Sequence, residues 1–255
     1  MKKTLKHTLS LVLALMMVVS TMAISVVTTS AASKTTYTLN VNTGGSNATS
    51  IDIMEVTVLG TNGETDTHTM HCMATKEGTK TVTFEDAVDV GEITCIRIKN
   101  IGIDDWYPNY ITISTPSDTE TIYGGRWIAD NKTVTLKDTD NVFKLEIKTG
   151  TETGAGTDDT VKITLKDANG RTATLLSADD IHTRTNAFEK GDCETIYMSA
   201  PDNFGQLKSI SIVLSSAGIL TPGGDWYIEN IYAKQVSGTY EGYSGNYLTN
   251  TWIDG

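Results

Sequence analysis

Hydrophobic and polar residues alternate along much of the chain, and a period of two predicts β-strands. The clearest cases are residues 51–59 and 161–166, which are followed by Asn62-Gly63 and Asn169-Gly170. Successive side chains of a strand point to opposite faces, so this alternation indicates sheets with one buried face. Asn-Gly after such a segment is typical of a tight hairpin turn.

Helical patterns are scarce. Thr, Val and Ile abound, and stretches of Ala, Leu, Glu and Lys at helical spacing are absent. Turn signals recur about every ten residues, as in sandwiches made of short strands. The chain is therefore predicted to be all-β and antiparallel.

The pattern occurs twice along the chain. Three pairs of segments match: residues 37–44 with 143–150, 104–111 with 224–231, and 122–130 with 246–254. The pairs keep their order while their offset grows, which insertions explain and a short solenoid repeat of fixed period does not. Each copy has about 100 residues, enough for its own core. We predict two tandem domains, residues 33–137 and 138–255, joined by the short stretch 138–141.

Residues 1–32 have the pattern of a secretion signal. A basic head precedes the apolar run 11–19, and small residues lead to Ala32 as the cleavage point. A membrane anchor needs about 20 apolar residues, and here Ser20 and Thr21 interrupt the run. We expect a signal peptide of bacterial type, cleaved near Ala32, and a secreted, extracellular protein.

The acidic composition excludes some partners. The net charge is −11, and the leader carries three lysines and no acid, so its removal leaves −14. Nucleic-acid binding requires clustered Lys and Arg and is not expected. Attraction to anionic lipid by charge alone is not expected either. An acidic surface favours solubility and also offers carboxylates to a divalent cation.

Catalytic residues are not predicted. The chain has no Gly-x-Ser-x-Gly, no His-Glu-x-x-His and no phosphate-binding glycine loop followed by Lys. Its histidines and cysteines form no recognisable nucleophile and base. Carboxylate pairs are abundant, so a hydrolase with an unrecognised carboxylate site remains a third alternative.

Cysteine and histidine do not indicate a structural metal site. Cys72, Cys95 and Cys193 are odd in number, and free buried thiols in strands are expected, although Cys72 and Cys95 could pair. Along a strand, His68 and Cys72 share one face while His71 points to the other, so zinc is not expected.

The second copy resembles a known domain family. The matching segments are Gly156-Thr157-Asp158-Asp159, residues 186–195, residues 207–212, Asp225-Trp226-Tyr227, and Tyr247 with Trp252. Together they are similar to the PLAT domain of lipoxygenases, polycystins and clostridial alpha-toxin. The first copy keeps Asp-Trp-Tyr and the closing Trp and reads as a degenerate member. The resemblance implies eight-stranded antiparallel β-sandwiches and a non-catalytic module that carries a protein to a membrane or to another protein.

The same resemblance implies a calcium site in the second copy. In the toxin branch, calcium bound by loops at one end helps the domain to meet lipid. Carried over by position, the ligands are the carbonyl of Gly156 with Thr157, Asp158, Asn186 and Asp225. These oxygen donors suit calcium. Gly154 and Ala187 stand where the family pattern has acids, which implies a weaker site or a single ion, and calcium is not expected in the first copy.

Aromatic residues complete the expectations. Trp106 and Trp226 occupy matching positions, one in each copy, which favours core packing. Weak surface contacts are assigned to Tyr227, Tyr240, Tyr243 and Tyr247, although a loop packing on itself is equally consistent. The leading prediction is a secreted binding protein for membrane lipid or for an extracellular protein or glycan surface. The alternative is an extracellular scaffold protein, and the oligomeric state is left open.

Overall fold

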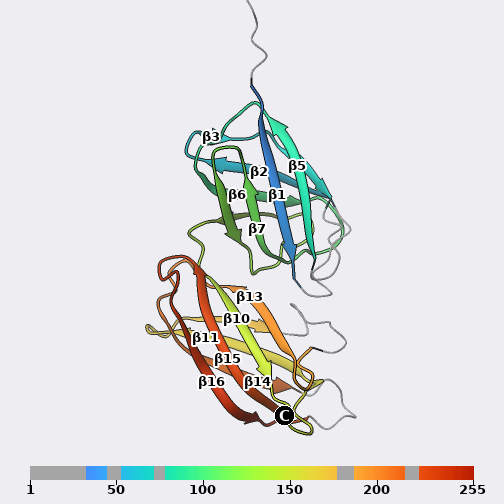
Figure 1. The fold of residues 1–255 in the computed structure, drawn as a ribbon, viewed down its shortest axis with the longest axis vertical. Helices are drawn as coiled ribbons and strands as arrows, with labels where there is room; N and C mark the ends of the chain where they lie inside the picture. Colours follow the sequence, from blue (N-terminus) through green and yellow to red (C-terminus); the bar gives the residue numbers. More distant parts are fainter. Residues whose placement is uncertain (1–32, 45–52, 72–77, 177–186, 216–223) are drawn as a thin grey trace, which may run out of the picture. The chain divides into compact units, whose positions relative to one another are not determined.

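The regular structure of the chain is β throughout the part that the computed structural model describes (Figure 1). The described residues are 33–44, 53–71, 78–176, 187–215 and 224–255. They contain sixteen strands and no α-helix, which confirms the all-β prediction. No helix long and apolar enough to cross a membrane occurs among them. The predicted signal peptide, Cys72 and Asn186 lie outside the described residues.

Two antiparallel sheets form the first sandwich. One has the order β5-β1-β7-β8 and the other β3-β2-β6-β9, with β4 also paired to β2. The strands are β1 (Thr35–Thr43), β2 (Ile53–Gly60), β3 (Gly63–Glu64), β4 (His68–His71), β5 (Thr79–Asp86), β6 (Ile93–Asn100), β7 (Pro108–Ser114), β8 (Thr119–Tyr123) and β9 (Thr133–Lys137). In β1 the alternation read from the sequence holds, because Tyr37, Leu39 and Val41 are buried while their neighbours are not.

The second sandwich repeats this plan. One sheet has the order β13-β10-β15-β16 and the other β12-β11-β14. The strands are β10 (Val142–Thr149), β11 (Thr160–Asp167), β12 (Thr172–Leu176), β13 (Cys193–Ser199), β14 (Leu207–Ser215), β15 (Trp226–Ser237) and β16 (Ser244–Ile253). Each core is lined mainly by the inward-facing residues of its own two sheets, and the second core also takes in Tyr107. The predicted β-sandwich class is confirmed.

One buried hydrogen bond recurs in both cores. Trp106 and Trp226 are fully buried. The indole Nε1 of Trp106 donates to Thr43 Oγ1 at 3.2 Å, and that of Trp226 donates to Thr149 Oγ1 at 3.0 Å. A buried indole N–H needs such an acceptor. The prediction of core tryptophans is confirmed, and the matching bonds show that the repeat is structural.

The Asn-Gly turns also stand where the sequence places them. Gly63, the first residue of β3, has a φ of 132°, and Gly170 between β11 and β12 has a φ of 86°. Glycine reaches these values without the steric cost that a Cβ brings.

The free thiols differ from expectation in their burial. Cys95 in β6 is half-buried, and Cys193 at the start of β13 is exposed. The expectation of buried thiols is therefore wrong for Cys193. The alternation in β13 turns Glu194 inward and leaves Cys193 outside.

His68 is engaged by a carboxylate of the first sandwich. Its Nε2 lies 2.7 Å from Asp86 Oδ2, and its ring stacks on Phe84 with centroids 3.9 Å apart. Burial opposes ionisation of Asp86, but hydrogen bonds from the Val88 amide, from His68 and from the Asp66 amide outweigh it and hold the pKa of Asp86 below its usual value.

Candidate functional site

Three loops meet at one end of the second sandwich. They are residues 150–159 after β10, residues 187–192 before β13, and Gly224-Asp225 before β15. Gly191 N donates to Gly150 O at 2.9 Å, Thr157 N donates to Phe188 O at 3.3 Å, and Gly224 N donates to Asp159 Oδ2 at 3.1 Å. This is the end at which the β10 arrow finishes, beside the C-terminus in Figure 1. We call it the loop end.

Four of the five candidate calcium ligands lie at the loop end. Asp158 and Asp225 are exposed, whereas Thr157 is buried and its hydroxyl accepts the Asp159 amide at 3.2 Å. Gly156 packs so closely on the neighbouring loop that an added Cβ would lie 3.0 Å from Lys190 N. The loops thus bring together segments that are some 70 residues apart in sequence, from Gly156 to Asp225.

The chemistry of these donors suits calcium only weakly. Carboxylate, hydroxyl and carbonyl oxygens are the ligand types that calcium takes, and water completes its six to eight positions. Among the described residues, no three His, Cys, Asp or Glu side chains are grouped to hold a metal. The five residues carried over from the family include two carboxylates, Asp158 and Asp225, and a site with only two charged ligands would belong to the low-affinity end of calcium sites, about 10⁻⁴–10⁻³ M.

Two acids at the loop end were missed from the sequence. Asp159 joins two of the loops through its bond to Gly224 N. Glu189 places its Oε2 3.2 Å from the position that a Cβ on Gly156 would occupy. The acidic pair Asp158-Asp159 could have indicated the first. No local pattern indicates Glu189, because its position depends on how the loops pack.

Aromatic side chains flank the same end. Tyr227 and Trp252 are opposite each other in the β15–β16 pairing, and their ring centroids are 5.0 Å apart. Trp252 is 44% exposed. The hydroxyl of Tyr227 donates to Asn250 Oδ1 at 3.3 Å. Since Asp225 is two residues before Tyr227, the half-buried Tyr227 and the exposed Trp252 lie next to the acidic loops.

The other candidate tyrosines follow the β15–β16 turn. Tyr240 and Tyr243 are 42% and 41% exposed. Tyr247 is half-buried, and its hydroxyl donates to Leu207 O at 3.3 Å. Burial raises the pKa of Tyr247 to about 12. Tyr240 and Tyr243 therefore offer their rings to solvent, whereas Tyr247 packs on the core.

The first copy holds an equivalent aromatic pair in a different setting. Tyr107 and Trp127 lie edge to face with centroids 5.2 Å apart. Tyr107 is 1% exposed, and its hydroxyl donates to the Tyr197 carbonyl of β13 at 2.5 Å. In the first copy, other parts of the protein therefore bury Tyr107. In the second copy, Trp252 of the corresponding pair stays exposed to solvent among the described residues.

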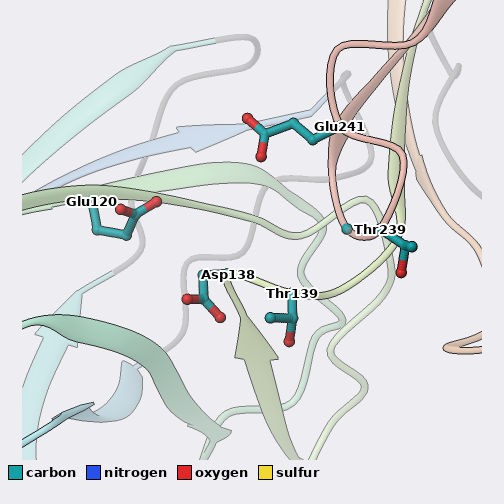
Figure 2. Close-up of a pocket in the computed structure, with 6 residues that line it drawn as sticks. Glu120, Asp138, Thr139, Thr239 and Glu241 are labelled. Carbon is teal, nitrogen blue, oxygen red and sulfur yellow. The ribbon is translucent and has the colours of Figure 1, made fainter.

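An acidic pocket of about 420 Å³ lies beside the β15–β16 turn. Figure 2 shows the carboxylates of Glu120, Asp138 and Glu241 around it, with Thr139 and Thr239. Burial raises the pKa of Glu120, and the negative charge of Asp138 adds to the effect. Three carboxylates make this pocket unfavourable for anionic ligands.

Comparisons with known proteins agree with the fold. The PLAT/LH2 domain model matches residues 37–137 and 143–255.

Among solved structures, the chain is similar to an anaerobic crystal structure of delta413-417:GS LOX in complex with arachidonate, at 22% identity and a TM-score of 0.37, covering 40% of this chain and 16% of that one. A crystal structure of delta413-417:GS LOX gives the same identity and TM-score, covering 41% of this chain and 16% of that one. This chain thus spans about one sixth of those enzymes, and a likeness this low carries no argument about activity. No curated protein matches. The two family matches cover most of the chain, which belongs to the PLAT/LH2 domain family and carries two tandem copies of the domain.

Proposed function

We propose that this protein is a secreted, non-catalytic binding protein that attaches to a lipid surface through the loop end of its second sandwich, with calcium assisting. PLAT domains mediate lipid or protein binding, and the choice of lipid rests on one observation. The exposed Trp252 packs on Tyr227 directly beside the acidic loops that carry Asp158 and Asp225.

Each part of this end has a role in the proposed attachment. A half-exposed indole suits the membrane interface, where its apolar ring is buried and its N–H stays near water. The neighbouring carboxylates are repelled by lipid phosphates. A calcium ion shared between Asp158, Asp225 and a headgroup phosphate removes that repulsion. Binding should therefore require both calcium and the aromatic ring.

Vesicle flotation tests the proposal. The protein should float with phosphatidylcholine vesicles at about 1 mM calcium, the weak end of the range for such sites, and remain at the bottom with a chelator. Trp252→Ala and Asp158→Asn should each abolish flotation. Tyr240→Ala, which removes an exposed aromatic from the β15–β16 turn, is the matched control and should float normally. Flotation that ignores calcium, or that survives both substitutions, would refute the proposed site.

A protein or glycan surface is the second candidate. The observation favouring it is the pair of exposed rings at Tyr240 and Tyr243, since rigid aromatics on a turn are frequent contacts for both partner types. In this case Tyr240→Ala should weaken retention on a glycan array or on an immobilised protein, and Trp252→Ala should not. Turnover of any substrate in a panel of esters and glycosides would contradict the non-catalytic part of the proposal.

A further inference from the structure

A broad area on the outer face of the first sandwich is polar but uncharged. Tyr37, Leu39 and Val41 of β1 are buried, so the residues between them point outward from the sheet β5-β1-β7-β8, in which β1 lies between β5 and β7 (Figure 1). The pairing registers align these outward residues with those of the other three strands in three rows. The first row holds Thr83, Thr38, Ser114 and Thr119, the second Thr81, Asn40, Thr112 and Thr121, and the third Thr79, Asn42, Tyr110 and Tyr123. We call these twelve residues the polar face, and each of them is exposed or half-buried.

The second copy carries charges on the corresponding face. Residues 37–44 match residues 143–150, so the outward positions of β1 correspond to those of β10. Where β1 holds Thr38, Asn40 and Asn42, β10 holds Lys144, Glu146 and Lys148. Since the whole chain has a net charge of −11, an uncharged area of this size is a local feature of the first copy.

One pair of contacting residues shows the exchange directly. In the first copy, Asn109 Nδ2 donates to Asn42 Oδ1 at 2.9 Å. At the two equivalent positions of the second copy, Lys148 Nζ donates to Glu229 Oε1 at 2.6 Å. The same contact is therefore an amide pair in one copy and an ion pair in the other.

Hydrogen bonds within the polar face hold its side chains in place. Thr81 Oγ1 donates to Asn40 Oδ1 at 2.7 Å, and the hydroxyls of Thr112 and Thr121 lie 3.0 Å apart. A hydroxyl has one donor and two acceptor positions, and a side-chain amide has two of each, so these bonds use only part of the capacity. Side chains that are already oriented lose less conformational entropy when a ligand binds.

The composition of the polar face argues against several partners. Protein interfaces are enriched in aromatic residues, Met and Arg and are depleted of Ser, whereas Thr, Asn and Ser fill ten of these twelve positions. Anionic lipid and nucleic acid attract clustered cations, and the polar face has none. An uncharged face is also cheaper to desolvate than a charged one. These properties complement a neutral ligand that is covered with hydroxyl groups.

We propose that the polar face binds a neutral, extended polysaccharide. Hydroxyls of the sugar chain exchange hydrogen bonds with the Thr and Asn side chains. Tyr110 and Tyr123, whose ring centroids are 6.0 Å apart at one end of the face, contact the C–H groups of the sugar rings. Rows about 7 Å apart on strands about 5 Å apart give a face about 14 Å wide in each direction, which accommodates several sugar rings. The inference goes beyond the proposed lipid attachment, which uses the loop end of the second sandwich, and it does not involve Tyr240 or Tyr243.

Retention on insoluble polysaccharides tests the proposal. The probes are cellulose, mannan and unsubstituted xylan, which are neutral. At least one of them should retain the purified protein, and the retention should persist in about 1 M salt, which screens interactions between charges. Retention on none of the three, or retention that disappears in salt, would overturn the proposal.

Exchanging outward residues between the copies locates the site. The triple variant Thr38→Lys/Asn40→Glu/Asn42→Lys gives β1 the outward residues of β10, which the second sandwich accommodates in the same fold. It should lower the retained fraction about ten-fold, because it removes hydrogen-bonding groups and adds charges that the ligand must desolvate. The reverse exchange, Lys144→Thr/Glu146→Asn/Lys148→Asn, is the matched control and should not reduce retention.

Single substitutions at an exposed position keep the test independent of folding. Thr81→Lys and Thr81→Glu should both weaken retention, since a neutral ligand gains from neither charge, while Thr195→Lys at the equivalent exposed position of β13 should not. Tyr240→Ala should be retained like the unmodified protein. Opposite effects of the two Thr81 substitutions, or retention that the exchange in β1 leaves unchanged, would overturn the proposal. A concentration-dependent dimer that the same exchange dissociates would overturn it too, by assigning the polar face to a second copy of the chain.

Discussion

Thr149→Val tests the buried hydrogen bond that the two copies share. The hydroxyl of Thr149 accepts the indole N–H of Trp226 at 3.0 Å and donates to the Phe188 carbonyl at 3.3 Å. Valine has nearly the same shape, so the substitution removes both bonds without opening a cavity. It leaves the buried indole N–H unsatisfied in a region where Thr149 is 1% exposed, while the Phe188 carbonyl keeps the hydrogen bond from the Thr157 amide.

The expected loss follows from these contacts. An orphaned buried polar group costs about 1–3 kcal/mol. The indole N–H accounts for this cost, because the Phe188 carbonyl still accepts the Thr157 amide, so the free energy of unfolding should fall by about 1–3 kcal/mol. That is a large share of the 5–15 kcal/mol typical of a whole protein. Thr43→Val removes the acceptor of Trp106 in the first copy and should cost about 1–3 kcal/mol.

Guanidinium unfolding followed by tryptophan fluorescence and by circular dichroism measures the loss. Thr174→Val is the matched control, because it deletes an exposed hydroxyl that pairs with Thr164 and should change the free energy by less than about 0.5 kcal/mol. If Thr149→Val costs no more than this control, the buried bond does not stabilise the core and the reasoning is refuted.

Three further predictions concern ionisation and packing. Asp86→Asn should destabilise the first sandwich by about 1–3 kcal/mol at neutral pH. Because the folded pKa of Asp86 is lowered, this difference should be complete above about pH 4 and shrink as the pH falls through that lowered pKa, which unfolding curves across the acid range would show. Gly150→Ala should displace the Tyr227 ring, whose Cε1 would lie 2.6 Å from the new Cβ, and weaken vesicle flotation while the far-ultraviolet spectrum stays unchanged; normal flotation would contradict the role of that ring. Tyr247→Phe should remove one phenol that ionises with a pKa of about 12 from the ultraviolet titration, and a phenol lost near pH 10 instead would disprove its burial.

Local patterns predicted the fold well because they report local geometry. Alternation, Asn-Gly turns and the repeated Asp-Trp-Tyr segment depend on a few neighbouring residues, and they gave the strands, the hairpins and the two buried tryptophans correctly. The pairing of His68 with Asp86 was beyond reach, since the two residues lie in strands of different sheets and meet only through the packing of those sheets.

The candidate site was predicted less completely. Gly156, Thr157, Asp158 and Asp225 were found together because the family pattern preserves their order, and whether they bind calcium stays a prediction. The exposure of Trp252 could not be read in advance. It depends on which surfaces remain uncovered after distant segments pack, because Tyr107 of the corresponding pair is buried in the first copy while Trp252 is exposed in the second.

The burial of Tyr107 has a mechanical consequence. Tyr107 belongs to the chain segment of the first sandwich, yet it packs within the core cluster of the second and donates its hydroxyl to Tyr197. A pulling force between a surface-bound second sandwich and the first would therefore act on this side-chain contact as well as on the peptide joint. The force is therefore shared between the peptide joint and the contacts of Tyr107. In a single-molecule pulling experiment, the two sandwiches of a Tyr107→Ala variant should separate at a lower force than those of the unmodified protein.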